Sequence, residues 1–262
     1  MAEWLRTPAG RYLLAWEQQH LDQAVSDLFG FHALQLGLLP LAALKANRMP
    51  HRWLCGNGAE MPDDADSRAV VALHCDFDAL PFASQSLDLV VLPHSLELAR
   101  DPHLTLREVE RVLVPEGRVV IVGFNPASLW GLRQRLGRLT RGIGIHRKRA
   151  LFLPSEGEFI GYRRLRDWLR LLSFEVEAGR FGCYRPPARS ERWLSRFEWT
   201  EGFGERWLPV FGAVYSLTAV KRVRGMRLVG LVREQRVKAK ASPQVVAQNH
   251  QHHTVHNGDD ET

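Results

Sequence analysis

Short apolar segments alternate with helical segments along this chain. Runs with the length of a buried strand occur at residues 32–37, 52–55, 69–75, 87–92, 118–122, 174–177 and 213–220. Helices are expected at residues 11–28, 38–46, 105–113 and 162–172. Strands that alternate with helices form a parallel sheet covered on both faces. The sequence therefore predicts an α/β fold with a doubly wound, mostly parallel seven-stranded sheet, whose ligands bind beyond the carboxyl ends of the strands.

The same pattern predicts the organisation of the chain. Residues 1–30 form an N-terminal helical segment, residues 31–232 form the main domain, and residues 233–262 form a polar tail that we expect to be disordered. Two inserts interrupt the domain, at about residues 126–158, after the fifth strand, and at about residues 183–209, before the last strand. The inserts are the parts of the chain that the alternating pattern does not explain.

The two inserts differ in character. The first is rich in Arg and Gly, and residues 128–139 mix apolar and basic side chains at helical spacing. Such a helix suits an anionic or membrane-borne acceptor, and it equally suits packing on the domain with solvated arginines. The second insert contains Trp193, Trp199 and Trp207, which suit either a substrate pocket or core packing.

Charge and cysteine content narrow the class of protein. A formal net charge of +6 admits nucleic acid, an anionic membrane surface or an acidic small molecule as a partner. Since no nucleic-acid-binding module accompanies the charge, specific nucleic-acid binding is not expected. The three cysteines, Cys55, Cys75 and Cys183, form no CxxC pair, which argues against a disulfide framework or a metal site. With no signal peptide and no apolar run near the ~20 residues that span a bilayer, a cytoplasmic protein is predicted.

One ordered set of motifs carries a family resemblance. It begins with Asp76-Phe77-Asp78-Ala79-Leu80-Pro81-Phe82, and continues with the strand at 87–92 and with His94-Ser95-Leu96-Glu97. A helix and the turn Pro115-Glu116-Gly117 follow. Over residues 70–125 this order resembles the type 11 group of class I S-adenosylmethionine-dependent methyltransferases, which have a Rossmann-like fold. The resemblance implies S-adenosylmethionine as the cofactor.

The resemblance also implies roles for single residues. Asp76 would accept a hydrogen bond from the exocyclic amine of adenine, with Phe77 and Leu80 as apolar walls. His94 would lie at the carboxyl end of the fourth strand, as a general base or as a histidine that bonds to backbone or solvent. Asp88 is expected to be structural. The complete set of expected cofactor contacts is Gln35, Leu36, Gly37, Asn57, Asp76, Phe77, Asp78, Leu80 and Pro93.

The chain departs from this family in its first motif. The family has an acidic residue followed by three glycines, because the backbone must pass close to the cofactor. Here Gln35 takes the acidic position, Gly37 remains, and Leu39 and Leu41 replace the other glycines. Asn57 stands where an acidic residue would hold the ribose hydroxyls.

Three functional hypotheses follow. The first is S-adenosylmethionine-dependent methyl transfer to a small-molecule or lipid-like acceptor, an activity that the altered first motif puts in question. The second is a non-catalytic relative that keeps the methyltransferase fold for binding or regulation. The third is a basic protein that docks on nucleic acid or anionic lipid.

Overall fold

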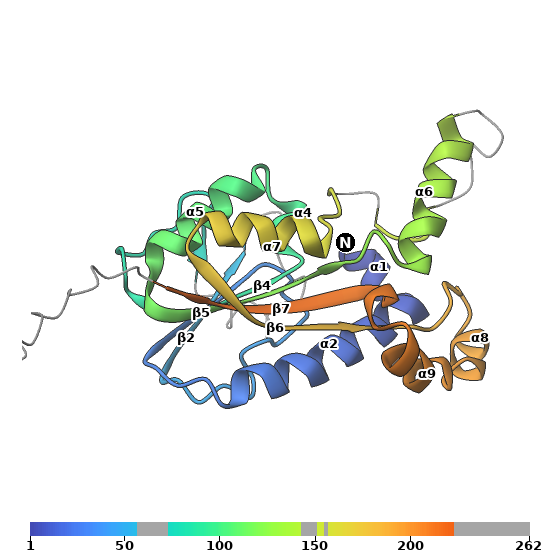
Figure 1. Cartoon of the computed structure of the whole chain (residues 1–262), viewed down its shortest axis with the longest axis horizontal. Coiled ribbons are helices and arrows are strands. Elements are labelled where there is room, and N and C mark those ends of the chain that lie inside the picture. The colour runs from blue at the N-terminus through green and yellow to red at the C-terminus, as the bar shows by residue number, and fades with distance from the viewer. Residues whose placement is uncertain (57–72, 143–150, 155–156, 223–262) are drawn as a thin grey trace, which may run out of the picture. The chain divides into compact units, whose positions relative to one another are not determined.

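A seven-stranded sheet organises the computed structural model, which describes residues 1–56, 73–142, 151–154 and 157–222. The strands are β1 (His32–Leu36), β2 (His51–Gly56), β3 (Leu73–His74), β4 (Leu87–Pro93), β5 (Leu113–Phe124), β6 (Phe174–Gly182) and β7 (Val214–Lys221). Their order in the sheet is β3-β2-β1-β4-β5-β7-β6 (Figure 1). The pairs among β1 to β5 are parallel, and β7 is antiparallel to both of its neighbours. The prediction of a doubly wound, mostly parallel sheet is confirmed.

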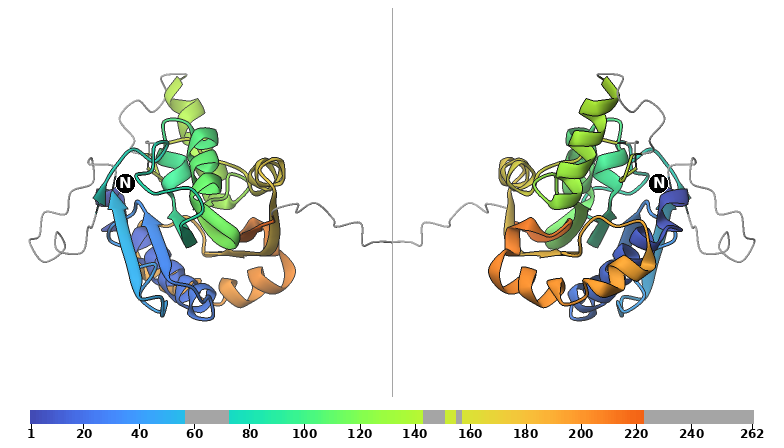
Figure 2. Two further views of the ribbon diagram at one scale, coloured as in Figure 1. Left: turned by 90° about the vertical axis from the view of Figure 1, so that its left-hand side faces the viewer. Right: turned by 90° about the vertical axis from the view of Figure 1, so that its right-hand side faces the viewer.

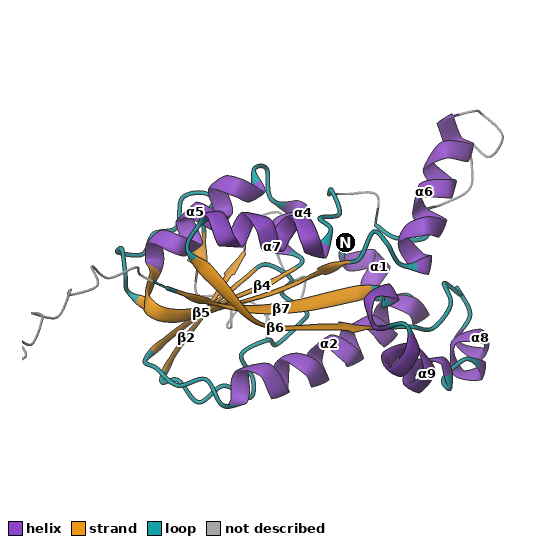
Figure 3. Cartoon of the chain, viewed as in Figure 1, coloured by secondary structure: helices purple, strands orange, loops and turns teal. Residues whose placement is uncertain are grey.

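Helices cover both faces of this sheet. The helix α2 (Pro8–Ser26) lies on one face, whereas α4 (Ser95–Leu98), α5 (Pro102–Val112) and α7 (Tyr162–Leu171) lie on the other (Figure 3). Successive strand residues point to opposite faces, so Val91 and Val120 join the core under α2 while Val90 and Val119 join the core under α5 and α7. Burial on both faces explains why these strands are almost continuously apolar.

The helix α2 begins and packs as its sequence dictates. The Thr7 hydroxyl caps its N-terminus by accepting a hydrogen bond from the Gly10 amide at 3.1 Å, and Pro8 stands at the first position. Its buried face repeats every four residues, at Ala9, Leu13, Glu17, Leu21 and Val25. The short helix α1 (Ala2–Leu5) precedes it. One position of this buried face therefore holds a charged residue, Glu17.

The prediction of a helix at residues 38–46 is wrong. The chain forms turns between β1 and β2 instead. The Gln35 side-chain amide donates to the carbonyl oxygens of Gly37, Leu38 and Leu41. In a helix, these carbonyl oxygens would have accepted the first backbone hydrogen bonds. Because they accept from the Gln35 side chain here, Gln35 stabilises the turns that stand where the helix was expected.

Of two other local expectations, the structural role of Asp88 holds, whereas the turn before the fifth strand is replaced by an irregular part of β5. Asp88 is structural, since its Oδ2 accepts hydrogen bonds from the amides of Phe31 and His32, each at 2.9 Å. The turn at residues 115–117 lies inside β5 as an irregularity, where the pairing with β4 shifts and Glu116 adopts a φ of 65°. The tail at 233–262 lies outside the described residues.

Both inserts leave the sheet at the same edge. The first carries α6 (Leu129–Gly142), and the second carries α8 (Glu191–Arg196), α9 (Thr200–Trp207) and the 3-10 turn η1 (Pro209–Phe211). Phe124 ends β5 and Gly182 ends β6, and both pair with Val214 of β7. Figure 2 (right) views the molecule from this end. Within the described residues, no helix has the length and apolar character needed to cross a bilayer.

Candidate functional site

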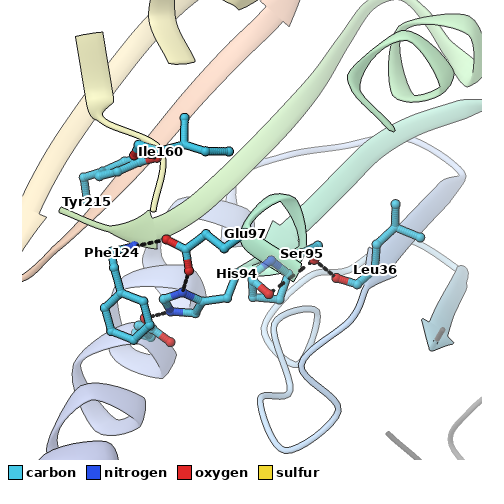
Figure 4. A network of polar contacts seen from close by, with 9 residues as sticks. Leu36, His94, Ser95, Glu97, Phe124, Ile160 and Tyr215 are labelled. Carbon is cyan, nitrogen blue, oxygen red and sulfur yellow. Dashed lines mark hydrogen bonds and ion pairs between the residues drawn. The ribbon is translucent and has the colours of Figure 1, made fainter. Parts of the chain in front are cut away.

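The carboxyl ends of four parallel strands bring most of the predicted cofactor residues to one edge of the sheet. After β1, the Gly37 amide donates to the Cys55 carbonyl oxygen of β2 at 2.8 Å. After β2, the Gly56 carbonyl oxygen accepts from the Cys75 amide at 3.1 Å. After β4, the Ser95 hydroxyl donates to the Leu36 carbonyl oxygen (Figure 4). Leu36, Gly37, Asp76 to Leu80 and Pro93 thus lie along one edge, whereas Asn57 lies outside the described residues.

Gly37 lies at the closest approach of two chain segments. Its φ of 73° is in the left-handed region that favours glycine. A Cβ atom here would stand 3.0 Å from Ser95 Oγ and 3.4 Å from Phe77 Cζ. Any side chain at residue 37 would therefore press on the loop after β3 and on the turn after β4.

The leucines that replace glycines differ in what they contact. Leu41 is buried in the core that α2 covers, so its side chain points away from the edge. Leu39 is half-buried, and its Cδ2 lies 3.6 Å from the position of a Cβ on Gly56. Of the two substitutions, only Leu39 borders the predicted site.

Gln35 uses its whole side chain within the protein. Its Nε2 donates to the carbonyl oxygens of Leu41 at 2.7 Å, Gly37 at 3.2 Å and Leu38 at 3.3 Å. Its Oε1 accepts from the Ala43 amide at 2.9 Å. Gln35 is buried, and it shapes the loop after β1 through these four hydrogen bonds.

The segment after β3 exposes a carboxylate next to an apolar floor. Asp76 is exposed and Asp78 half-buried, while Phe77 and Leu80 are buried. Helix α5 holds this loop in place, because Glu108 accepts from the Leu80 amide at 3.1 Å and Arg111 donates to the Leu80 carbonyl oxygen at 3.0 Å. Glu108 and Arg111 also pair with each other at 2.8 Å.

These residues fit the adenosine end of S-adenosylmethionine. An exposed carboxylate on Asp76 can accept from an exocyclic amine, and Phe77 and Leu80 place apolar side chains next to it. Gly37 brings the loop after β1 close to Ser95 and Phe77. The described residues contain no group of three or more His, Cys, Asp or Glu side chains placed to hold a metal ion.

A buried ion network lies beside this edge. His94 follows β4 with a left-handed φ of 55° and is fully buried under the ring of Phe124, 4.4 Å between centroids. Its Nε2 lies 2.7 Å from Glu17 Oε1, and its Nδ1 lies 2.8 Å from Glu97 Oε2. The other oxygen of Glu97 accepts from the Phe124 amide at 2.5 Å (Figure 4). The network thus joins α2, α4 and the end of β5.

Electrostatics keeps the imidazole of His94 charged. Burial alone lowers the pKa of His94, but the carboxylates of Glu17 and Glu97 outweigh it and raise this pKa to about 10. Burial raises the pKa of Glu97, and His94 and the Phe124 amide oppose that rise. Burial and the charge of Glu17 raise the pKa of the Cys183 thiol well above its usual range. At neutral pH both ring nitrogens of His94 therefore donate, and neither has a free lone pair.

The sequence prediction missed three residues that build this region. Glu17 carried a signal, since it is the charged residue in the otherwise apolar four-residue repeat of α2. Glu108 and Arg111 also carried one, because residues three apart on a helix are neighbours and an acid-base pair at that spacing suggests a joint role. No pattern in the sequence indicated that Glu108 and Arg111 bond to the backbone of Leu80.

Comparison with known proteins identifies the type of domain. A family model described as a methyltransferase domain matches residues 41–121, beginning at the last position of the altered glycine segment. The uncharacterized protein YafS of Escherichia coli is 36% identical over 182 residues, which are 68% of this chain and 67% of that protein.

Two further likenesses cover different shares of the chain. A malonyl-(acyl-carrier protein) O-methyltransferase of Halorhodospira halophila is 36% identical over 72 residues, which are 28% of this chain and only 24% of that protein. A solved S-adenosylmethionine-dependent methyltransferase of Archaeoglobus fulgidus matches with a TM-score of 0.52 and 17% identity, over 79% of this chain and 94% of that one. At this identity the second likeness shows the fold alone.

Proposed function

Because the chain belongs to the family of YafS and carries a class I S-adenosylmethionine-dependent methyltransferase domain, we propose that it transfers a methyl group to a small-molecule or lipid-like acceptor. The observation that carries this proposal is the exposed carboxylate of Asp76 beside the buried Phe77 and the left-handed Gly37. S-adenosylmethionine would supply a methyl group on a positively charged sulfur, which needs only a well-placed nucleophile.

We assign the cofactor contacts as follows. Asp76 accepts from the adenine amine, and Phe77 and Leu80 contact the ring, with Asp78 at the rim of the same loop. Leu36, Gly37 and Pro93 would hold the cofactor along the edge that their backbone forms. Gln35 acts indirectly by holding the loop after β1. Asn57 is assigned to the ribose hydroxyls from its place in the sequence alone.

We assign His94 a positioning role at this site, where the sequence had suggested either a general base or a histidine that bonds to backbone or solvent. A general base needs an unprotonated nitrogen within reach of the acceptor, and here both nitrogens bond to carboxylates. The charged imidazole fixes α2 against the end of β4. It thereby sets the shape of the edge on which an acceptor would lie.

We favour an acceptor that is anionic or membrane-associated. We also propose that the reaction takes place in the cytoplasm. The O-methyl transfer named for the Halorhodospira relative supports an oxygen acceptor, and the arginine-rich first insert leaves the same edge of the sheet as the site. Cys55, Cys75 and Cys183 are free thiols, which persist in a reducing compartment.

One observation favours the alternative of a non-catalytic binding or regulatory protein. The glycine loop of the family is here a set of turns held by Gln35, with Leu39 at its rim and with no helix after it. A protein of this kind would keep the fold and lose methyl transfer. Cofactor binding and methyl transfer must therefore be measured separately.

The deciding experiment is a calorimetric titration of the protein with S-adenosylmethionine and with its demethylated product. We expect binding to the wild type and a loss of about 10- to 100-fold in affinity for Asp76→Ala, since a hydrogen bond to a charged group is removed. Asp27→Ala is the matched control, because Asp27 is an exposed carboxylate that follows the C-terminus of α2. No heat at millimolar ligand would refute the proposal.

Transfer itself is tested with radiolabelled methyl donor in a cell lysate. Label that appears with the wild type and disappears with Asp76→Ala supports catalysis. Binding without any transfer would support the non-catalytic alternative.

A further inference from the structure

The helix α6 exposes a stripe of leucines. Leu129, Leu132, Leu136 and Leu139 are 55%, 53%, 53% and 62% exposed. Their spacing of three, four and three residues places them on one face of a helix. Isolated surface leucines need no explanation, but a contiguous apolar stripe on a water-soluble surface marks an interaction site.

The opposite face of α6 holds the helix to the protein. Trp130 is buried and donates from Nε1 to the Arg185 carbonyl oxygen at 2.7 Å. Gln134 is buried and accepts from the amides of Phe152 and Leu153 at 3.1 and 3.0 Å. The leucine stripe therefore faces away from the packed side, on a helix that stands out from the sheet (Figure 1).

Basic residues flank this stripe. Arg133 and Arg135 fall on either side of the leucines around the helix, and Arg138 is also exposed. Residues 126–154 contain seven Arg and Lys residues and no Asp or Glu. An apolar stripe between cations is the pattern of a helix that lies in the plane of an anionic membrane surface.

A second exposed apolar patch lies at the same edge of the sheet. Trp193, Trp199, Phe203 and Trp207, on α8, on α9 and just before α9, are 55%, 65%, 50% and 66% exposed. The pairing of Phe124 and Gly182 with Val214 places the starts of both inserts side by side. Tryptophan is favoured where one part of a surface is apolar and the other is wet, as in the interfacial layer of a membrane.

We propose that α6 and the segment from α8 to η1 form a membrane-docking surface, which lies on an anionic lipid bilayer. Charge decides between the possible occupants. Two copies of α6 would bring arginines against arginines, whereas lipid phosphates complement them. The surface adjoins the predicted site, so docking would bring that edge of the sheet to the membrane. The inference does not rest on the proposed function, because lipid binding needs no cofactor.

The test is sedimentation of the full chain with vesicles. We expect binding to vesicles of equal parts phosphatidylglycerol and phosphatidylcholine, and binding at least about tenfold weaker to phosphatidylcholine alone or in high salt. The double variant Leu132→Glu with Leu136→Glu should abolish binding. Arg135→Glu should weaken it by about fivefold or more.

Matched controls use the same substitutions elsewhere. Leu171, on α7, is 84% exposed, and Arg107 is exposed on α5. Leu171→Glu and Arg107→Glu should bind as the wild type does, and thermal unfolding verifies that every variant is folded. Three results would overturn the proposal. The first is no binding to anionic vesicles at low salt, and the second is an equal loss of vesicle binding in the control variants. The third is a protein that does not bind vesicles but forms a dimer, which the α6 leucine variant disrupts.

Discussion

His94 links two residues that are far apart in the chain. Glu17 comes from α2, and Glu97 comes from α4, after β4. A buried ion pair gains little over apolar packing, but removal of one partner costs about 3–5 kcal/mol because a charge is left unpaired. The value of this network therefore lies in fixing α2 on the sheet, and it makes the stability of the protein depend on pH.

We expect the free energy of unfolding to fall as the pH rises from about 6.5 to about 10. In this range the folded protein keeps the proton on His94 while the unfolded chain releases it, so raising the pH favours unfolding. With a pKa raised from 6.5 to about 10, the loss is on the order of 3–5 kcal/mol. Urea titrations at several pH values measure it.

The matched variants for this prediction are Glu17→Gln and Glu3→Gln. Glu17→Gln removes one carboxylate from His94, so the pKa of His94 should fall. The loss of stability still begins near pH 6.5, but it should end at a lower pH and be smaller. Glu3 is exposed on α1, and Glu3→Gln should leave the pH profile unchanged. If His94 positions the site, the pH profile of methyl transfer should shift in the same direction in Glu17→Gln. An identical pH dependence in all three proteins would show that the network does not hold this proton.

At the scale of elements, the turns between β1 and β2 depend on one side chain. Gln35→Glu restores the acidic type that the family has at this position, yet here it should destabilise the protein by about 2–3 kcal/mol. The carboxylate cannot donate to the three carbonyl oxygens that Gln35 now satisfies. Chemical denaturation measures the change, and Gln19→Glu, at an exposed position of α2, should cost less than about 0.5 kcal/mol.

The strands and the helices α2, α5 and α7 could be predicted from the sequence, whereas the turns between β1 and β2 could not. Strands such as β4 are apolar on both faces, and that pattern is local. The prediction of a helix at 38–46 failed because of Gln35, which precedes this segment in the chain. The side-chain amide of Gln35 bonds to carbonyl oxygens that a helix would have used. Likewise Asp76 could be predicted from its motif, whereas the role of Glu17 appears only in the structure, where α2 brings it to His94. Interactions between distant segments leave at most a weak trace in a local pattern.

The whole molecule is built unevenly around its sheet. The amino-terminal edge of the parallel strands carries short connections, such as the one in which Asp88 binds the chain entering β1. The carboxyl edge carries the predicted site, the buried ion network and both inserts. The helix α2 connects these parts, because it reaches β4 through Glu17 and the end of β6 through Trp16.

Gly182→Ala tests whether α2 acts as this connection. A Cβ on Gly182 would lie 2.0 Å from Trp16 Cε2, so the helix or the strand must move, at a cost of about 1–3 kcal/mol. Gly202→Ala is the control, since nothing lies within 4 Å of its added methyl group, and alanine within a helix should be neutral or stabilising by up to about 1 kcal/mol. If α2 connects the end of β6 with the ion network of His94, Gly182→Ala should also move Glu17 and lower the pKa of His94. Unfolding at pH 7 and pH 10 measures both effects, and a loss of stability with an unchanged pH dependence would mean that the end of β6 and the ion network are independent.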